Sequence, residues 1–367
     1  MSDLHSDRAL SQGSSAANEF SNLTPLDSVD GGGGVGLMGS ASPPGRIDRR
    51  ECLSQAGSVL LAGLLGSATN RCLAETEPRP GKVSGDAIIR GGRPGDEIVI
   101  RTTDRLAGAI HSVRWQNQEF IDSADHGRQL QSACSFDLSQ PGEFWAECYN
   151  PTEAGSRADG AGATSSSRLL SLRHGPDWLE TESRMAFWLR PGEKSAGRPA
   201  LNQAILSEHR LWKRVRIGYR DLPQLLDYQV RFTIPNGELH RYAQFEALTG
   251  YMPPAFSRFE SLDPAGEPQP LDDGPGEQSQ PVLFSTPSGS HAMGIYSPDQ
   301  PSKGFELAGY GRFRFPAEKV VKWNCVFRIR HATQVPAGDY TFQMFVPIGT
   351  RDEVLKTLRT LRSLTKR

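Results

Sequence analysis

The chain lacks several features that would assign it to a common functional class. Its 367 residues carry a formal net charge of −1, and no strongly basic or acidic block follows residue 75. Nucleic acid is therefore not an expected partner, because phosphate binding needs a concentrated basic surface. No GxSxG, HExxH or P-loop motif occurs in a suitable context, so the enzyme classes that those motifs define are not indicated.

Cysteine is scarce, and its spacing argues against one type of metal site. Five cysteines are present and no two of them have CxxC spacing, so no metal ion and no cofactor is predicted. Cys134 and Cys148 could form a disulfide in an oxidising compartment. Free buried thiols, including Cys325, are the equal alternative.

Long apolar runs are also missing. The apolar stretch Ala56–Ala68 is shorter than the roughly 20 residues that span a bilayer, so no stable membrane span is expected. It follows the pair Arg49-Arg50 and leads to small residues ending at Ala74, which resembles a twin-arginine signal peptide over residues 48–74. Residues 1–47 are rich in Ser, Gly, Asp and Asn and are predicted to be a disordered extension, or partly to precede a true start at Met38. The protein is thus expected to be exported, to the periplasm or outside the cell.

Residues 75–367 are predicted to form one β-sandwich domain. Short runs of alternating polar and apolar residues, such as Asp96–Thr102, are separated by turn signals such as Pro235–Gly237. Many strands joined by short turns indicate a mostly antiparallel β fold rather than βαβ units. Gln116-Asn117-Gln118 is expected to turn a hairpin, and Leu262–Gln280 is expected to be a long loop within the domain.

A single helix is predicted, at the C-terminus. Thr350 and Glu353 form a capping-box pattern at its start, and Val354, Leu358 and Leu361 line one face.

The segment from Asp125 to Gly155 gathers many hydrogen-bonding side chains. Each hydroxyl of a sugar uses both a donor and an acceptor, so such a segment suits a polyhydroxylated ligand. His126 could act as an acid or base near neutral pH, and Glu147 or Glu153 could act as a general base. The predicted catalytic residues are therefore His126, Glu147 and Glu153. The predicted substrate-binding residues of this segment are Asp125, Arg128, Gln129, Gln131 and Asn150.

Structural roles are the alternative for the same residues. Asp125 could cap backbone amides and pair with Arg128, and the stretch Glu147–Ser156 could be a solvated loop with turn chemistry.

Two more binding residues are predicted in Phe245–Pro254. Glu246 lies in an apolar strand, where a carboxylate must be paired or have its pKa raised by loss of hydration. It could tune a site, or it could pair with an arginine such as Arg241. Tyr251 could stack on the face of a sugar ring.

The stretch GAIHSVRWQNQEFID, Gly108–Asp122, resembles the first hairpin of galactose-mutarotase-like proteins. The resemblance implies an antiparallel β-supersandwich, and it places Arg128, with His126 as a further candidate, in a sugar site. The stretches DHGRQLQSA, ECYNPTEAGS, EALTGYMPP, GIYSPD and VVKWNCVFR also resemble a group of uncharacterised exported bacterial proteins.

The sequence therefore predicts an exported carbohydrate-binding or carbohydrate-active protein that holds a sugar or polysaccharide on a polar concave face. If it is an enzyme, it is expected to be a glycoside hydrolase, lyase or epimerase that uses His/Glu acid-base chemistry. The alternative is a non-catalytic carbohydrate-binding protein or a structural envelope protein.

Overall fold

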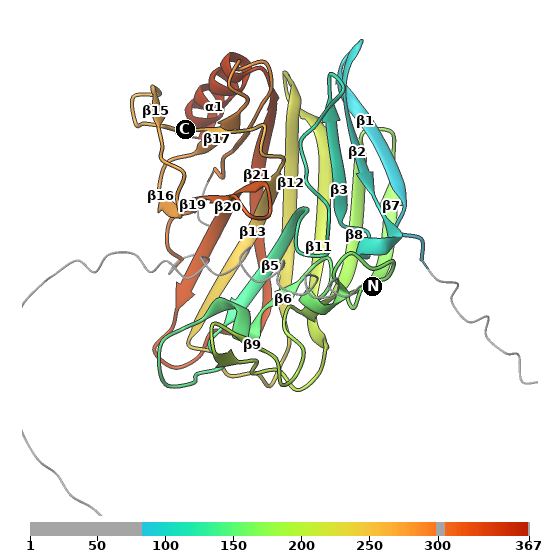
Figure 1. The fold of residues 1–367 in the computed structure, drawn as a ribbon, viewed down its shortest axis with the longest axis vertical. Helices are drawn as coiled ribbons and strands as arrows, with labels where there is room; N and C mark the ends of the chain where they lie inside the picture. The colour runs from blue at the N-terminus through green and yellow to red at the C-terminus, as the bar shows by residue number, and fades with distance from the viewer. Residues whose placement is uncertain (1–82, 299–304, 366–367) are drawn as a thin grey trace, which may run out of the picture. The chain divides into compact units, whose positions relative to one another are not determined.

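The computed structural model of the chain describes residues 83–298 and 305–365. The predicted extension at 1–47 and the predicted signal peptide at 48–74 lie outside the described residues. The described part consists of short and long strands in antiparallel pairs with one α-helix near the C-terminus (Figure 1). This confirms the predicted class, a mostly antiparallel β fold with a C-terminal helix.

One series of paired strands holds the N-terminal strands of the domain. Its members, in order of pairing, are β1 (Ala87–Arg93), β2 (Asp96–Thr102), β3 (Ile110–Trp115), β5 (Leu130–Phe136), β13 (Tyr242–Met252), β20 (Val320–Arg330), β19 (Gly309–Phe315) and β16 (Gly276–Gln278). We call it the first sheet. The short β4 (Gln118–Glu119) pairs with β3 to close the expected hairpin, and Gln116 and Asn117 adopt positive φ values of 47° and 64° at its turn.

The second sheet holds most of the remaining strands. In order of pairing these are β7 (Arg168–His174), β8 (Trp178–Phe187), β11 (Leu206–Tyr219), β12 (Leu222–Ile234), β21 (Gly338–Gly349), β18 (Ala292–Ile295), β17 (Val282–Ser285), β14 (Arg258–Leu262) and β15 (Pro268–Pro270). The two-residue β6 (Pro151–Thr152) pairs with β5 on one side and β8 on the other, so it links the sheets. A separate hairpin joins β9 (Lys194–Ser195) to β10 (Arg198–Pro199), and single 3₁₀ turns occur at η1 (Asp104–Leu106), η2 (Ala146–Tyr149) and η3 (Arg157–Asp159).

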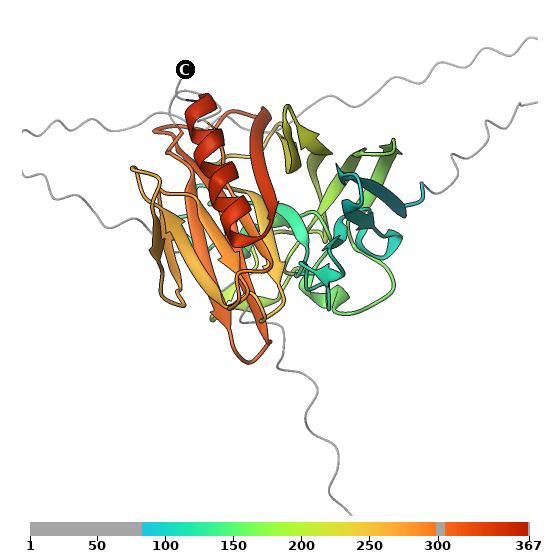
Figure 2. The same cartoon turned by 90° about the horizontal axis from the view of Figure 1, so that it is seen from above.

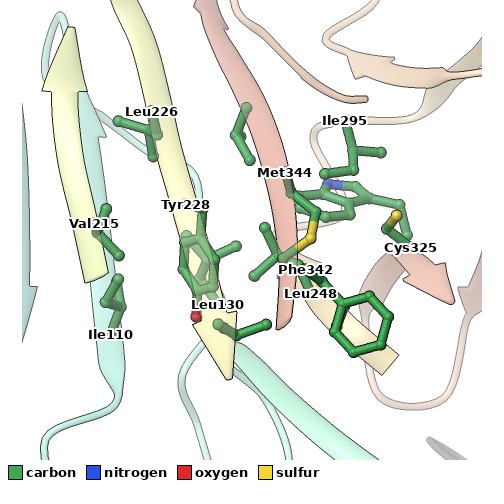
Figure 3. Packing of buried hydrophobic residues seen from close by; sticks show 14 of the residues in the cluster. Ile110, Leu130, Val215, Leu226, Tyr228, Leu248, Ile295, Cys325, Phe342 and Met344 are labelled. Atoms are coloured by element: carbon green, nitrogen blue, oxygen red, sulfur yellow. The ribbon is translucent and has the colours of Figure 1, made fainter. Parts of the chain in front are cut away.

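The two sheets share one apolar core. Alternation along each strand turns one row of side chains toward it, as Ile98 and Ile100 of β2 show beside the exposed Glu97. Figure 3 shows Leu130 of the first sheet near Tyr228 of the second, with both side chains fully buried. Burial of each such large apolar side chain stabilises the fold by about 1.5–3 kcal/mol.

Helix α1 (Arg351–Thr365) covers the other face of the second sheet (Figure 2). Its apolar residues Val354, Leu358 and Leu361 pack with buried residues of β17 and β18. The predicted capping box is present, because the Thr350 amide donates to Glu353 Oε2 over 2.9 Å and the Glu353 amide donates to Thr350 Oγ1 over 3.4 Å.

One local expectation was too simple. The stretch Leu262–Gln280, predicted to be a loop, contains β15 and β16. Both are three-residue strands with a paired strand on one side, and β15 begins and ends with proline. Proline is tolerated on such edges because they leave some N–H groups without a ladder partner. None of the helices among the described residues combines the length and apolar character needed to cross a membrane.

Candidate functional site

Four of the predicted binding residues converge on one pocket, which we call the polar pocket. It lies on the face of the first sheet that points away from the shared core. Its lining residues are Gln131, Ala133, Asn150, Thr152, Trp188, Glu246, Thr249 and Tyr251. The predicted residues among them are Gln131, Asn150, Glu246 and Tyr251.

Strand register explains why these side chains meet. Along β5, Leu130, Ser132 and Cys134 are buried on one side, which leaves Gln131 and Ala133 on the other, as the alternation of a strand requires. Gln131 lies opposite Thr249 of β13 in the antiparallel ladder. Ala133 of β5 lies opposite Glu246 on one side and Thr152 of β6 on the other.

A buried charge pair borders the pocket. Glu246 Oε2 lies 3.3 Å from the Lys322 ammonium and accepts a hydrogen bond of 2.9 Å from the Thr249 hydroxyl. Burial by itself would lower the pKa of Lys322, but the neighbouring Glu246 carboxylate outweighs this effect and the pKa is raised above its ordinary value. The Lys322 ammonium also lies 5.2 Å from the centre of the Tyr251 ring. Burial raises the pKa of Tyr251 to about 12.

The amide groups are fixed by backbone contacts. Gln131 Nε2 donates to the Gly127 carbonyl over 2.9 Å. The other polar atom of the same amide, Oε1, is buried and accepts no hydrogen bond from any described residue. Asn150 Nδ2 donates to the Cys134 carbonyl and the Ser135 hydroxyl, each over 2.8 Å. The pocket therefore contains an acceptor oxygen that a hydroxyl or a water could satisfy.

The pocket is small. Its cavity volume is about 20 Å³, which is space for one water-sized group and not for a whole sugar ring. Trp188 closes one side and packs so closely on Gly127 that an added Cβ there would lie 2.7 Å from the indole. A sugar could place one hydroxyl inside while its ring remains at the rim.

The loop before β5 holds four other predicted residues, Asp125, His126, Arg128 and Gln129, and each of them has a structural partner. Arg128 contacts Asp125 Oδ2 through Nε at 3.0 Å and Nη2 at 2.9 Å, while Asp125 Oδ1 accepts from the Gly127 amide over 2.8 Å. This is the pairing of Asp125 with Arg128 that the sequence offered as the structural alternative. His126 is 1% exposed, and its ring nitrogens lie 2.7 Å and 3.0 Å from the carbonyl oxygens of Gly160 and Arg105. Gln129 is fully buried and donates to the Asp125 carbonyl.

The two glutamates predicted to be catalytic lie away from the polar pocket's lining. Glu147 is buried in η2. Glu153 is 1% exposed, accepts a 3.1 Å hydrogen bond from the Ser132 amide, and forms an ion pair with the fully buried Lys213. None of His126, Glu147 and Glu153 lines the polar pocket.

Sequence reasoning missed Thr152, Trp188, Thr249 and Lys322. Lys322 could have been predicted from the sequence. It is a charged residue in the apolar stretch VVKWNC, just as Glu246 is a charged residue in the apolar stretch FEALTGY. Two opposite charges in apolar strands suggest a pair, because neither charge is stable alone in a core. The three cysteines of the described part, Cys134, Cys148 and Cys325, are free buried thiols, the second of the two alternatives.

A larger hollow, which we call the arginine hollow, lies on β1–β3. Its volume is about 470 Å³, and its lining includes Arg90, Arg101 and Arg114. The ladders place Arg90 and Arg114 on either side of Val99 in one cross-strand row, with Arg101 two residues further along β2. Arg90 and Arg101 form no ion pair with any residue that the structure describes, whereas Asp96 and Glu97 add negative charge to the same hollow.

Comparisons with known proteins give no family for this chain. No family model matches it, and no curated protein matches it. Among solved structures, the Slr1438 protein from Synechocystis sp. PCC 6803 is 10% identical with a TM-score of 0.37, and the match covers 72% of this chain and 96% of that one. YeaD from Salmonella typhimurium, provisionally described as a mutarotase, is 8% identical with a TM-score of 0.30, with 72% and 94% covered.

A third solved structure belongs to a much longer protein. The 4-alpha-glucanotransferase from Thermococcus litoralis is 9% identical with a TM-score of 0.37, and the match covers 73% of this chain but 40% of the enzyme. Identities and TM-scores in this range carry no argument about what the present chain binds, so its function has to be argued from its own pockets.

Proposed function

We propose that the protein is an exported carbohydrate-binding protein and that the polar pocket receives one hydroxyl-bearing group of a sugar or polysaccharide. The observation that carries the proposal is the convergence of Gln131 of β5, Glu246 and Tyr251 of β13, and Asn150 at the end of η2 on one pocket beside Trp188. Amide, carboxylate and ring side chains in one place are the set that holds hydroxyl groups and the apolar face of a sugar.

Binding is favoured over hydrolysis by the charges at this pocket. Hydrolysis of a glycosidic bond uses two carboxyl groups that flank the bond. Glu246 is the carboxylate among the lining residues, and it is engaged by Lys322 and Thr249. Its role in the proposal is to accept a hydrogen bond and to fix Lys322 beside the pocket.

The test is a panel of soluble and insoluble glycans, scored for binding, for new reducing ends and for unsaturated products. Gln131→Met removes the buried acceptor at nearly constant volume, and we expect it to weaken binding at least about tenfold, equivalent to about 1.4 kcal/mol. Gln129→Met is the matched control, because Gln129, just before β5, also has a buried amide whose Oε1 has no hydrogen-bond partner among the described residues, yet it does not line the pocket. No product is expected from any glycan.

Two outcomes would count against the proposal. One is a folded parent protein that binds no glycan on the panel. The other is equal binding by the Gln131→Met and Gln129→Met variants. If the parent protein generates new reducing ends or unsaturated products, it is an enzyme and not only a binding protein.

The arginine hollow supports a second candidate, the binding of sulfated or uronate-bearing glycans. Its volume of about 470 Å³ lies in the range of ligand pockets, and guanidinium groups match carboxylate and sulfate oxygens. In that case Arg101→Ala should weaken binding of anionic glycans and leave neutral ones unaffected. Arg216→Ala, an exposed arginine of β11 outside this hollow, is the control. Retained binding of anionic glycans by Arg101→Ala would eliminate this candidate.

A further inference from the structure

Two buried histidines and one glutamate meet on the core side of the second sheet. His209 stands in β11, in the inward-facing row that also holds Leu211 and Lys213. Glu238 and His240 lie in the segment between β12 and β13, two residues apart. The ligand atoms of His209, Glu238 and His240 all lie within 4.8 Å of one another.

Glu238 Oε2 is the centre of this group. It lies 2.8 Å from His240 Nε2 and 3.4 Å from His209 Nε2. The other carboxylate oxygen, Oε1, accepts a 2.8 Å hydrogen bond from the Tyr149 hydroxyl, which fixes the plane of the carboxylate. An orienting contact of this kind on a carboxylate ligand is typical of metal sites.

The histidines have more hydrogen-bonding capacity than the protein uses. His209 is 1% exposed and His240 is fully buried. Neither ring nitrogen of His209 forms a hydrogen bond to a described residue, and the same holds for Nδ1 of His240. The 3.4 Å approach of His209 Nε2 to Glu238 is an ion-pair contact without a hydrogen bond. Because buried polar atoms are nearly always hydrogen-bonded, these nitrogens point to a missing ligand.

Aromatic rings hold both imidazoles in place. The Phe136 ring lies 4.5 Å from His240 and 4.9 Å from His209, centre to centre, with interplanar angles of 29° and 31°. The Glu238 side chain is 20% exposed and adjoins Leu239, which is 60% exposed, so the group can be reached from solvent on that side. The surroundings thus orient the three side chains while leaving an entry path.

We propose that His209, Glu238 and His240 bind a divalent transition-metal ion of the Zn²⁺ type. Bond lengths of about 2.0–2.2 Å to histidine and carboxylate imply donor atoms roughly 3.3–3.5 Å apart around a tetrahedral ion. The 3.4 Å distance from His209 Nε2 to Glu238 Oε2 lies in this range, and the 2.8 Å distance from His240 Nε2 is shorter than it. All three ligand atoms lie within 4.8 Å of one another, so ring movements of about an ångström would complete the site. Two histidines and one carboxylate also suit Fe²⁺, and three protein ligands leave a coordination position open, as in catalytic rather than structural sites.

The experiment uses the full chain. Purified protein is stripped with a chelator, then titrated with Zn²⁺, Co²⁺ and, without oxygen, Fe²⁺, and the bound metal is measured by mass spectrometry. We expect about one ion per chain. We also expect a Co²⁺ complex with the visible absorption of nitrogen and oxygen ligands and without a thiolate charge-transfer band.

Variants locate the ion. His240→Gln and Glu238→Gln should each lower the metal affinity at least about tenfold, since each removes a direct ligand. His291→Gln is the matched control, because His291 also has a buried, unpartnered Nε2 but lies outside the cluster. Circular dichroism checks that each variant is folded.

The Co²⁺ titration of the parent protein tests the proposal even if a variant fails to fold. Absence of stoichiometric binding by the folded parent overturns it, and the three side chains then form a hydrogen-bonded group without metal. A thiolate charge-transfer band, or unchanged affinity in folded His240→Gln and Glu238→Gln, would place the ion elsewhere and overturn it as well.

Discussion

Two lysine–glutamate pairs are buried in the part of the chain that the structure describes, and they differ in what surrounds them. Lys213 and Glu153 are sealed in the core, with side chains that are 0% and 2% exposed. Lys322 and Glu246 are nearly as buried, at 1% and 9%, but Glu246 borders the polar pocket. Both pairs consist of the same two residue types, so the difference lies in their environment alone.

The contacts of each pair show what that environment does. Glu153 uses its oxygens on the Lys213 ammonium and the Ser132 amide, and burial, with a contribution from Glu153, holds the pKa of Tyr228 well above its usual range. No residue of this pair lines a described pocket. Lys322, by contrast, lies against the Tyr251 ring of the pocket wall. Burial of a charge therefore marks a candidate site only when an opening adjoins it.

The largest effect should come from breaking the sealed pair. Lys213→Met leaves the Glu153 carboxylate buried without its counter-charge, and we expect the free energy of unfolding to fall by about 3–5 kcal/mol. Urea denaturation at pH 7 measures it. The double variant Lys213→Met/Glu153→Leu removes both charges and should recover most of that loss. A single variant as stable as the parent would show that Glu153 is not held as a charge.

A smaller effect should follow from breaking the pair at the pocket. Lys322→Met leaves Glu246 with the Thr249 hydroxyl and with access to water in the pocket, so a loss of about 1–3 kcal/mol is expected. The same denaturation experiment measures this loss, and the glycan panel should show weaker binding for this variant but not for Lys213→Met/Glu153→Leu. If Lys322→Met lost as much unfolding free energy as Lys213→Met, water in the pocket would not stabilise the unpaired Glu246 carboxylate.

The smallest effect is the pH dependence of stability that Tyr251 contributes at the polar pocket. The pKa of Tyr251 is raised by burial to about 12, so the folded protein keeps the phenol proton at a pH where the unfolded chain has lost it. The stabilisation is complete below about pH 10, declines as the pH rises, and is lost above about pH 12. At pH 11 it has fallen by about 1.4 kcal/mol.

Tyr251→Phe removes this term. The difference in unfolding free energy between parent and variant should therefore shrink between pH 9 and pH 11, measured by denaturation at each pH. A difference that stays constant across that range would show that the phenol is not shielded as the structure describes.

Much of the fold could be predicted from local patterns. Alternation in Asp96–Thr102, the turn at Gln116-Asn117 and the cap at Thr350 each depend on residues close together in the chain, and all are present as expected. The alternation of side chains along β5, which places Gln131 and Ala133 on one face, depends in the same way on neighbours in the chain.

The site could be predicted only in part. Asp125 and Arg128 pair with each other, which the sequence offered as the structural alternative. Glu153 instead pairs with Lys213 of β11, a partner that only the fold brings near. The partner of Glu246 in the structure is Lys322, which depends on the pairing of β13 with β20. The histidine cluster was not predicted. Cysteine spacing says nothing about histidine ligands, and Glu238-x-His240 supplies only two of the three side chains, because His209 comes from a distant strand.

The sequence by itself determined the strand class, the turns, the C-terminal helix and which residues of each strand face inward, because those properties follow from neighbours along the chain. Only the tertiary structure decided which polar side chains meet at a pocket and which are neutralised in the core. Those contacts join strands far apart in the sequence. A shift of one residue in the register of β5 against β13 would point Gln131 into the core and remove it from the pocket lining.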